Sequence, residues 1–172
     1  MFASPRALKF AALVAAALAL GACSRADQTA AVGGGLGAGG VGGAGGAGAP
    51  GSAQEFSVSV GDRVFFETDS SDLTPRAVAT LDRQAQWLTQ YPRYTILLEG
   101  HADERGTREY NFSLGARRAQ TVRDYLASRG ISAARVRTVS YGKERPVAVC
   151  NDISCWSQNR RAVTVLEGGA GV

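Results

Sequence analysis

The segment GHADERGTREYNFSLGARRA (Gly100–Ala119) decides how this chain of 172 residues folds. The residues leading into it, Tyr94–Gly100, read as a strand, and the apolar run Ile96–Leu98 indicates burial on both faces of that strand. Within the segment, Thr107 can cap a helix that continues to Arg129. The segment therefore predicts a buried strand, a polar turn and a long helix in direct succession.

The helix predicted after the polar turn has one apolar side and a defined end. Leu114, Val122 and Leu126 lie on the side that should face a core. Gly130 follows the last turn, where a residue with positive φ commonly ends a helix. We expect this helix to pack on a sheet that contains the preceding strand.

A second helix is predicted earlier in the chain. Thr74 fits an N-cap, and Pro75 fits the first helical position, where its missing N–H costs nothing. The helix should run to about Gln90, because Pro92 cannot continue it. Its apolar positions form one stripe: Val78, Leu81, Ala85 and Leu88.

Three further strands complete the predicted fold. Ser57–Glu67 alternates around a turn at Gly61-Asp62, Val136–Tyr141 is a third strand, and Arg161–Leu166 is a fourth. The apolar residues expected on one side of their strands are Val58, Val60, Val64 and Phe66 in the first and Val163 and Val165 in the last. The order β-α-β-α-β-β predicts an α+β domain, an α/β sandwich with helices packed on a mixed sheet. We place this domain at residues 56–167, with a disordered tail at 168–172.

The composition excludes one class of partner. The formal net charge is +4, and removal of Arg6 and Lys9 with the N-terminal leader leaves about +2. Basic residues alternate with acidic ones rather than forming a block, so we expect no nucleic-acid binding.

The first 22 residues read as a secretory signal peptide that is cleaved. Arg6 and Lys9 give a positive start, Phe10–Leu20 is apolar, and small residues follow at Gly21 and Ala22. The apolar run is too short for a membrane-spanning helix, which needs about 20 residues.

Leu20-Gly21-Ala22-Cys23 resembles the lipobox of bacterial lipoproteins. This resemblance implies cleavage before Cys23 and attachment of lipid to that cysteine, with insertion of the acyl chains in a membrane. Ser24 in the following position implies sorting to the outer membrane, because an Asp there would favour the inner membrane. We therefore expect a lipid-anchored chain whose domain faces the periplasm.

Residues 23–55 combine the lipidated N-terminus with a flexible tether rich in glycine and alanine. Its large side chains are too few to offset the entropy of ordering. Gly40–Gly45 matches the dinucleotide-binding pattern G-x-G-x-x-G, but no strand precedes the match and no helix follows it. We assign no cofactor to the chain.

Several separated segments resemble the OmpA-like peptidoglycan-binding family. They are Gly100–Thr107 followed by Tyr110, Asn111–Ala119, Val139–Gly142 and Asn159–Arg161. The resemblance covers about Val58 to Leu166, which is essentially the whole predicted domain. It implies that the domain holds the stem peptide of peptidoglycan by its diaminopimelate residue.

Diaminopimelate carries carboxylates and an ammonium, so its site needs an acid and a fork-shaped cation. The resemblance places the acid at Asp103 and the cation at Arg118, whose guanidinium can pair bidentately with a carboxylate. The peptidoglycan-binding positions that it implies are Asp103, Arg118, Asn111, Thr68, Asp69 and Leu114. Many family members have an aromatic where Thr68 stands. By residue type alone, Asp103 equally fits a turn cap and Arg118 a solvated helix position.

The remaining reactive residues predict no catalysis and no metal site. His101 is the only histidine, and neither a second histidine nor a G-x-S-x-G motif is available for a hydrolytic site. Cys150 and Cys155 are the other cysteines, and export favours a disulfide between them, with a metal pair as the alternative. We expect a binding protein rather than an enzyme.

The resemblance also implies partners beyond the cell wall. It implies a protein that tethers the outer membrane to peptidoglycan within the Tol system, with TolB and other Tol proteins as partners and a part in cell division. Two alternatives stay open: a wall-binding lipoprotein outside the Tol system, and a wall hydrolase that uses the domain for targeting. Because one small domain must serve both, we expect peptidoglycan and TolB to compete.

Overall fold

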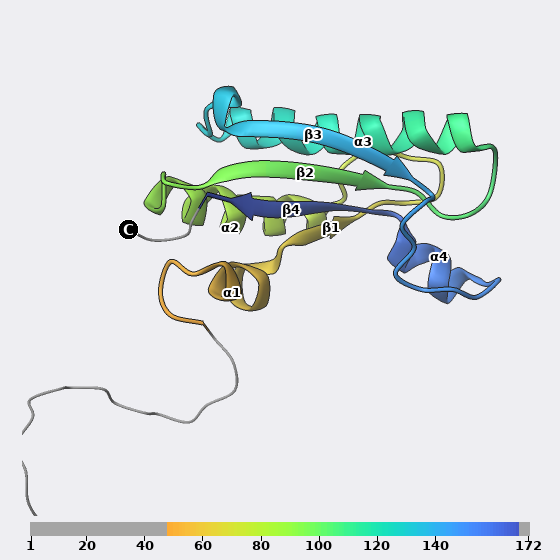
Figure 1. The fold of residues 1–172 in the computed structure, drawn as a ribbon, viewed down its shortest axis with the longest axis horizontal. Coiled ribbons are helices and arrows are strands. Elements are labelled where there is room, and N and C mark those ends of the chain that lie inside the picture. Colours follow the sequence, from red (N-terminus) through yellow and green to blue (C-terminus); the bar gives the residue numbers. More distant parts are fainter. Residues whose placement is uncertain (1–47, 169–172) are drawn as a thin grey trace, which may run out of the picture. The chain divides into compact units, whose positions relative to one another are not determined.

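A computed structural model describes residues 48–168 of the chain. The predicted signal peptide, Cys23, most of the tether, the Gly40–Gly45 match and residues 169–172 lie outside the described residues. Figure 1 shows the elements, which in chain order are α1 (Ala53–Glu55), the π-helical η1 (Phe56–Gly61), β1 (Arg63–Phe65), α2 (Pro75–Gln90), β2 (Thr95–His101), α3 (Arg108–Ser128), the 3-10 helix η2 (Ala133–Arg135), β3 (Val136–Gly142), α4 (Ile153–Asn159) and β4 (Arg161–Glu167).

The four strands form one mixed sheet in the order β1-β4-β2-β3. β2 pairs with β3 in parallel, and β4 runs antiparallel to both β1 and β2. Helices α2 and α3 contact each other and cover the same face of the sheet (Figure 1). The predicted α+β class with helices on a mixed sheet is therefore confirmed.

Both long helices begin at the residues that the sequence predicts. The Thr74 hydroxyl accepts a hydrogen bond from the N–H of Ala77, and Thr107 accepts one from Tyr110. Between the helices and the sheet lies a continuous apolar core, whose largest fully buried members include Phe56, Leu81, Leu88, Ile96, Leu98 and Leu126. On α2 the buried stripe includes Ala77, while Val78, which the sequence placed in that stripe, is only half-buried.

The predicted first strand is wrong over residues 57–61. These residues form the turn of η1, Val58 is 62% exposed, and the strand is limited to Arg63–Phe65. The chain coils here because Ser52 caps α1 and the ring of Phe56 packs 4.9 Å from that of Trp87. That aromatic contact holds Phe56 in the core.

The folded unit also begins earlier than residue 56. The carboxylate of Glu55 accepts hydrogen bonds from the Trp87 indole and from the N–H of Gly51, at 2.8 and 2.7 Å. Tyr94 and Arg93 both donate to the carbonyl of Gly51. The last residues of the expected tether are thus part of the domain.

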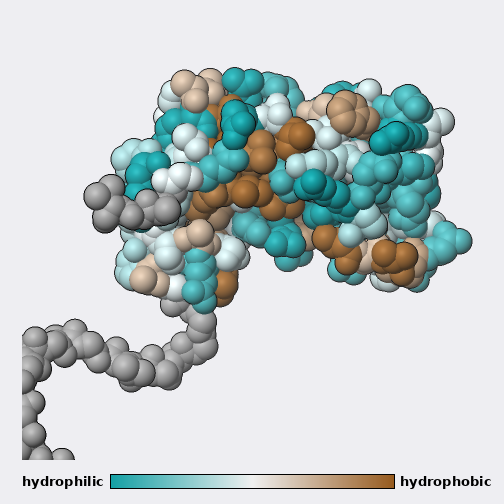
Figure 2. Space-filling model, viewed as in Figure 1, coloured by the Kyte–Doolittle hydropathy of each residue, from teal (hydrophilic) through white to brown (hydrophobic). Residues whose placement is uncertain are grey.

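The second face of the sheet carries no helix within residues 48–168. Val163 and Val165 lie on this face, half-buried, whereas their neighbours Ala162 and Thr164 point at the helices. Leu97 is also only half-buried, so burial on both faces of β2 is incomplete. Figure 2 shows the resulting band of apolar side chains on the side viewed in Figure 1.

Candidate binding site

The end of β2, the loop after it and the first turns of α3 meet at one end of the sheet. Two glycines allow this approach. A Cβ on Gly100 would lie 1.8 Å from the carbonyl oxygen of Gly115, and a Cβ on Gly115 would lie 2.5 Å from the Ser140 hydroxyl. That hydroxyl donates to the carbonyl of Phe112 at 2.6 Å, which fixes α3 against β3. The helix is therefore held against the strand ends that carry the predicted site.

Asp103 lies in the loop after β2 and is 7% exposed. Its carboxylate accepts hydrogen bonds from the guanidinium of Arg105 at 3.1 and 2.7 Å, and from Arg160 at 3.3 Å. It also accepts one from the backbone N–H of Arg105. Burial would raise the pKa of this carboxyl group, but the hydrogen bonds from Arg105 and Arg160 outweigh burial and lower the pKa below its ordinary value. Asp103 is therefore an ionised acid that is almost enclosed.

Arg118 is fully buried rather than solvated, as position on a helix alone had left possible. Its guanidinium donates to the carbonyls of Ser70 and His101, both at 2.8 Å, and of Glu67 at 3.1 Å. Burial lowers the pKa of Arg118 to about 10, and the nearby charge of Arg160 acts in the same direction. Arg118 therefore ties the loop after β1 to the end of β2.

The other predicted positions lie on α3 or in the loop after β1. The Asn111 amide donates to the carbonyl of Arg105 at 2.6 Å and so holds the loop that carries Asp103. Asp69 has a positive φ of 57° and accepts a hydrogen bond from the Tyr110 hydroxyl. Thr68 is exposed beside it, and Leu114 is buried.

The structure brings the predicted residues to the same end of the sheet, and in the free protein Asp103 has arginine partners that the sequence did not point to. Among residues 48–168, Asp103 forms ion pairs with Arg105 and Arg160, and none with Arg118. Sequence reasoning gave neither Arg105 nor Arg160 a role. Arg105 could have been found from its place two residues after Asp103, whereas Arg160 is 57 residues away and only the fold brings it near.

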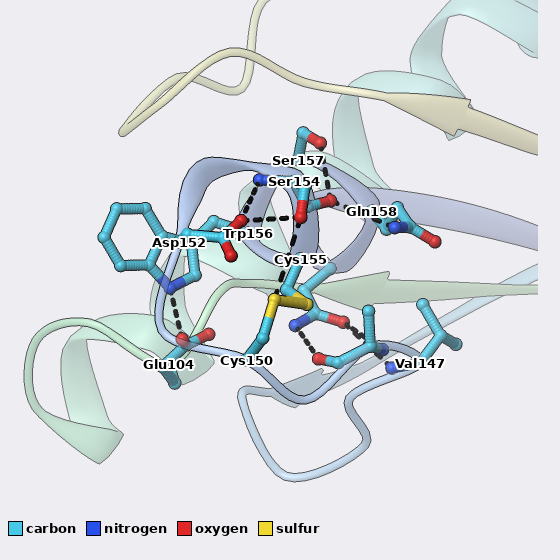
Figure 3. The surroundings of a disulfide bond; sticks show 11 residues. Glu104, Val147, Cys150, Asp152, Ser154, Cys155, Trp156, Ser157 and Gln158 are labelled. Atoms are coloured by element: carbon cyan, nitrogen blue, oxygen red, sulfur yellow. Dashed lines mark hydrogen bonds between the residues drawn. A yellow bond between two sulfur atoms is a disulfide. The ribbon is translucent and has the colours of Figure 1, made fainter.

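The segment closed by the Cys150–Cys155 disulfide lies beside Glu104 of the loop after β2 (Figure 3). The predicted bond between Cys150 and Cys155 is present, with the two Cα atoms 5.6 Å apart. The next residue, Trp156, donates its indole N–H to the Glu104 carboxylate. The guanidinium of Arg105 lies 4.1 Å from the centre of the Trp156 ring. Trp156 belongs to α4, a short helix that the sequence did not predict.

His101 shows no geometry suited to catalysis or metal binding. It is 2% exposed, and neither ring nitrogen has a hydrogen-bond partner in the described part of the chain. Burial lowers its pKa to about 4, and Arg161 and Arg145 add to this shift. Within residues 48–168, no group of three His, Cys, Asp or Glu side chains is arranged to hold a metal ion.

Comparison with known proteins shows the family of this chain. Residues 65–160 match the model of the OmpA family, and the chain belongs to that family. A protein of Rhizobium meliloti named peptidoglycan-associated lipoprotein is 64% identical over 156 residues, which cover 90% of this chain and 84% of that protein. A protein of the same name from Pseudomonas aeruginosa is 45% identical over 157 residues, covering 89% and 93%.

Solved structures agree with this placement. The crystal structure of the peptidoglycan-associated lipoprotein from Burkholderia pseudomallei is 42% identical, with a TM-score of 0.62 over 64% of this chain and 96% of that one. The C-terminal domain of Helicobacter pylori MotB, at 23% identity and a TM-score of 0.59 over 63% of this chain and 86% of that one, shares the fold alone. No helix among the described residues is long and apolar enough to cross a membrane.

Proposed function

We propose that this chain is an outer-membrane lipoprotein that binds peptidoglycan without covalent chemistry and tethers the membrane to the wall. The observation that carries the proposal is the 64% identity, over 90% of this chain, with a protein named peptidoglycan-associated lipoprotein. An ionised acid enclosed beside buried arginines is the chemistry that a zwitterionic side chain such as diaminopimelate requires.

In this proposal Asp103 receives the ammonium of diaminopimelate. Arg118 has five N–H donors, and its three carbonyl contacts leave others for a ligand carboxylate. Because Arg118 is fully buried, such a contact requires the loop with Thr68 and Asp69 to separate from the end of β2. Asn111 sets the position of the Asp103 loop by donating to the carbonyl of Arg105, and Leu114 is buried three residues further along the same helix.

The anchoring half of the proposal rests on residues outside the described range. Lipid on Cys23, after cleavage of residues 1–22, would hold the chain in the outer membrane with the domain in the periplasm. The tether before the domain would let it reach the wall. We propose no enzymatic activity, cofactor or nucleic-acid partner.

Membership of the Tol system is the finer part of the proposal. TolB and other Tol proteins would be the partners, with a part in envelope integrity and cell division. Co-purification of TolB with the lipoprotein separates this from the alternative of a wall binder outside the Tol system. We also propose that TolB and peptidoglycan compete, and isolation of a stable ternary complex would contradict that.

Two stem peptides that differ only at the third residue test the ligand. One carries diaminopimelate, and the other carries lysine, which keeps the ammonium but lacks the second carboxylate. We expect the diaminopimelate peptide to bind at least about tenfold more tightly in calorimetric titration, because a hydrogen-bonded charge is worth about 1.5–3 kcal/mol. Equal affinities would contradict the proposed recognition of diaminopimelate.

A further inference from the structure

We propose that Arg105 is an internal competitor for the ligand: its guanidinium holds Asp103 in the free protein and must leave before an external ammonium can bind. This inference rests on the proposed function, because the cation that displaces Arg105 is the ammonium of the stem peptide. It adds a residue that sets the affinity of the site and its preference for ligands with an ammonium group.

The two cations on Asp103 are not equivalent. Arg160 is 5% exposed, bonds to Asp103 through one nitrogen at 3.3 Å, and also donates to the carbonyl of Phe66. The Arg105 side chain is 41% exposed and grips both carboxylate oxygens. Arg160 is thus part of the frame, whereas Arg105 occupies the solvent side of the carboxylate, where a ligand must arrive.

Arg105 is also held from its other side. Its guanidinium lies over the ring of Trp156, and Glu104 fixes that ring by accepting the indole N–H. Trp156 directly follows Cys155, so the disulfide-closed segment helps to fix the position of the Trp156 ring. Asp103 and Trp156 therefore hold Arg105 directly, and Glu104 holds it indirectly by fixing Trp156.

Displacement of Arg105 exchanges one cation for another on Asp103. The exchange leaves the net charge around Asp103 unchanged, so a ligand with an ammonium can open the site, whereas a neutral or anionic ligand cannot. A partly exposed ion pair and one cation–π contact are both weak interactions. The competition should therefore reduce ligand affinity by about three- to tenfold rather than abolish binding.

Titration of a diaminopimelate muropeptide into the full chain in detergent tests the proposal. Arg105→Ala should bind the muropeptide about three- to tenfold more tightly than wild type. Arg105→Lys, which keeps a cation but loses the two-pronged grip, should fall between them. Arg137→Ala is the matched control, because Arg137 is an exposed arginine paired with Glu167 at the opposite end of the sheet, and it should bind like wild type. Unchanged or weaker binding by Arg105→Ala would overturn the proposal.

Two further readouts separate failure of this inference from failure of the proposed function. In ligand-free protein, Arg105→Ala should raise the pKa of the Asp103 carboxyl group measured by NMR, and an unchanged pKa would overturn the inference without any ligand. Trp156 emission should change when the muropeptide binds wild type, and this change should be absent in Arg105→Ala. If the Arg105–Asp103 pair is present but no variant binds muropeptide, the proposed function fails, and the competitor role fails with it.

Discussion

At the residue scale, buried arginines organise this domain. The guanidinium of Arg118 is fully buried, and its hydrogen bonds to three backbone carbonyls offset the cost of removing its charge from water. The negative charge of Asp103 favours the charged form of Arg118, whereas the like charge of Arg160 opposes it. The sequence identified Arg118 and Asp103 by family resemblance, but not their contacts, because burial and partners depend on segments that are distant along the chain.

Arg118→Lys tests the bracing role of the guanidinium. A lysine ammonium cannot reach three carbonyls in a fixed fork, so we expect the free energy of unfolding to fall by about 2–4 kcal/mol. Urea denaturation followed by circular dichroism measures this change. Arg117→Lys is the control, because Arg117 is the exposed neighbour on the same helix and should change stability by less than about 0.5 kcal/mol.

His101 should make the domain less stable in mild acid. Its pKa is lowered to about 4 in the folded protein, against 6.5 ordinarily, so folding favours the neutral ring. The stability from this group is complete above pH 6.5 and is lost as the pH falls from 6.5 towards 4, by about 3 kcal/mol. Asp103 acts in a lower window, because its lowered pKa lies below 3.8.

Denaturation of wild type and His101→Gln at pH 7.5 and pH 4.5 measures the histidine contribution. The stability of the variant should change less between these two pH values than that of wild type. Equal changes in the two proteins would show that other groups cause the acid sensitivity.

At the element scale, N-cap residues and a helix-ending glycine predicted the bounds of the helices better than hydrophobic alternation predicted the bounds of the first strand. Thr74 and Thr107 start α2 and α3 as expected, because their hydroxyls satisfy free backbone N–H groups locally. The alternation from Val58 to Phe66 predicted a longer strand than the one observed, since packing of Phe56 on Trp87 is a tertiary effect. α4 was missed because its seven residues give no apolar period.

Gly100→Ala should disturb the contact between α3 and β2. The new methyl group would meet the backbone of Gly115, which cannot rotate away, so we expect a loss of about 2–4 kcal/mol in the free energy of unfolding. At Gly130→Ala only the positive φ of 92° opposes the substitution, with open space around it, and about 1 kcal/mol should be lost. Thermal unfolding of both variants checks this order, which equal losses would contradict.

Reduction of the Cys150–Cys155 disulfide should destabilise the segment that carries Trp156. Closure of so short a loop contributes about 2–3 kcal/mol in the chain-entropy model. Thermal unfolding with and without a phosphine reductant measures the loss, and the double variant Cys150→Ser, Cys155→Ser should reproduce it without responding to reductant. No shift in wild type on complete reduction would show that the bond contributes nothing to stability.

At the scale of the whole molecule, the sequence predicted the order of the long elements, the α+β class and the disulfide. These depend on local signals such as caps, apolar periods and two closely spaced cysteines. Strand order, the helix-free face of the sheet and the pairing of Asp103 with Arg160 depend on tertiary contacts, which one sequence does not specify. The lipid anchor and tether stay predictions, because they lie outside the described residues.

The most direct test of wall binding is co-sedimentation of the purified lipoprotein with isolated peptidoglycan sacculi. Wild type and Arg137→Ala should sediment with the wall. Asp103→Asn should stay in solution while still folded by circular dichroism, because loss of a desolvated charge contact costs about 2–5 kcal/mol. If folded wild-type protein stays in the supernatant, or if Asp103→Asn sediments as wild type does, the proposed binding of peptidoglycan through Asp103 is wrong.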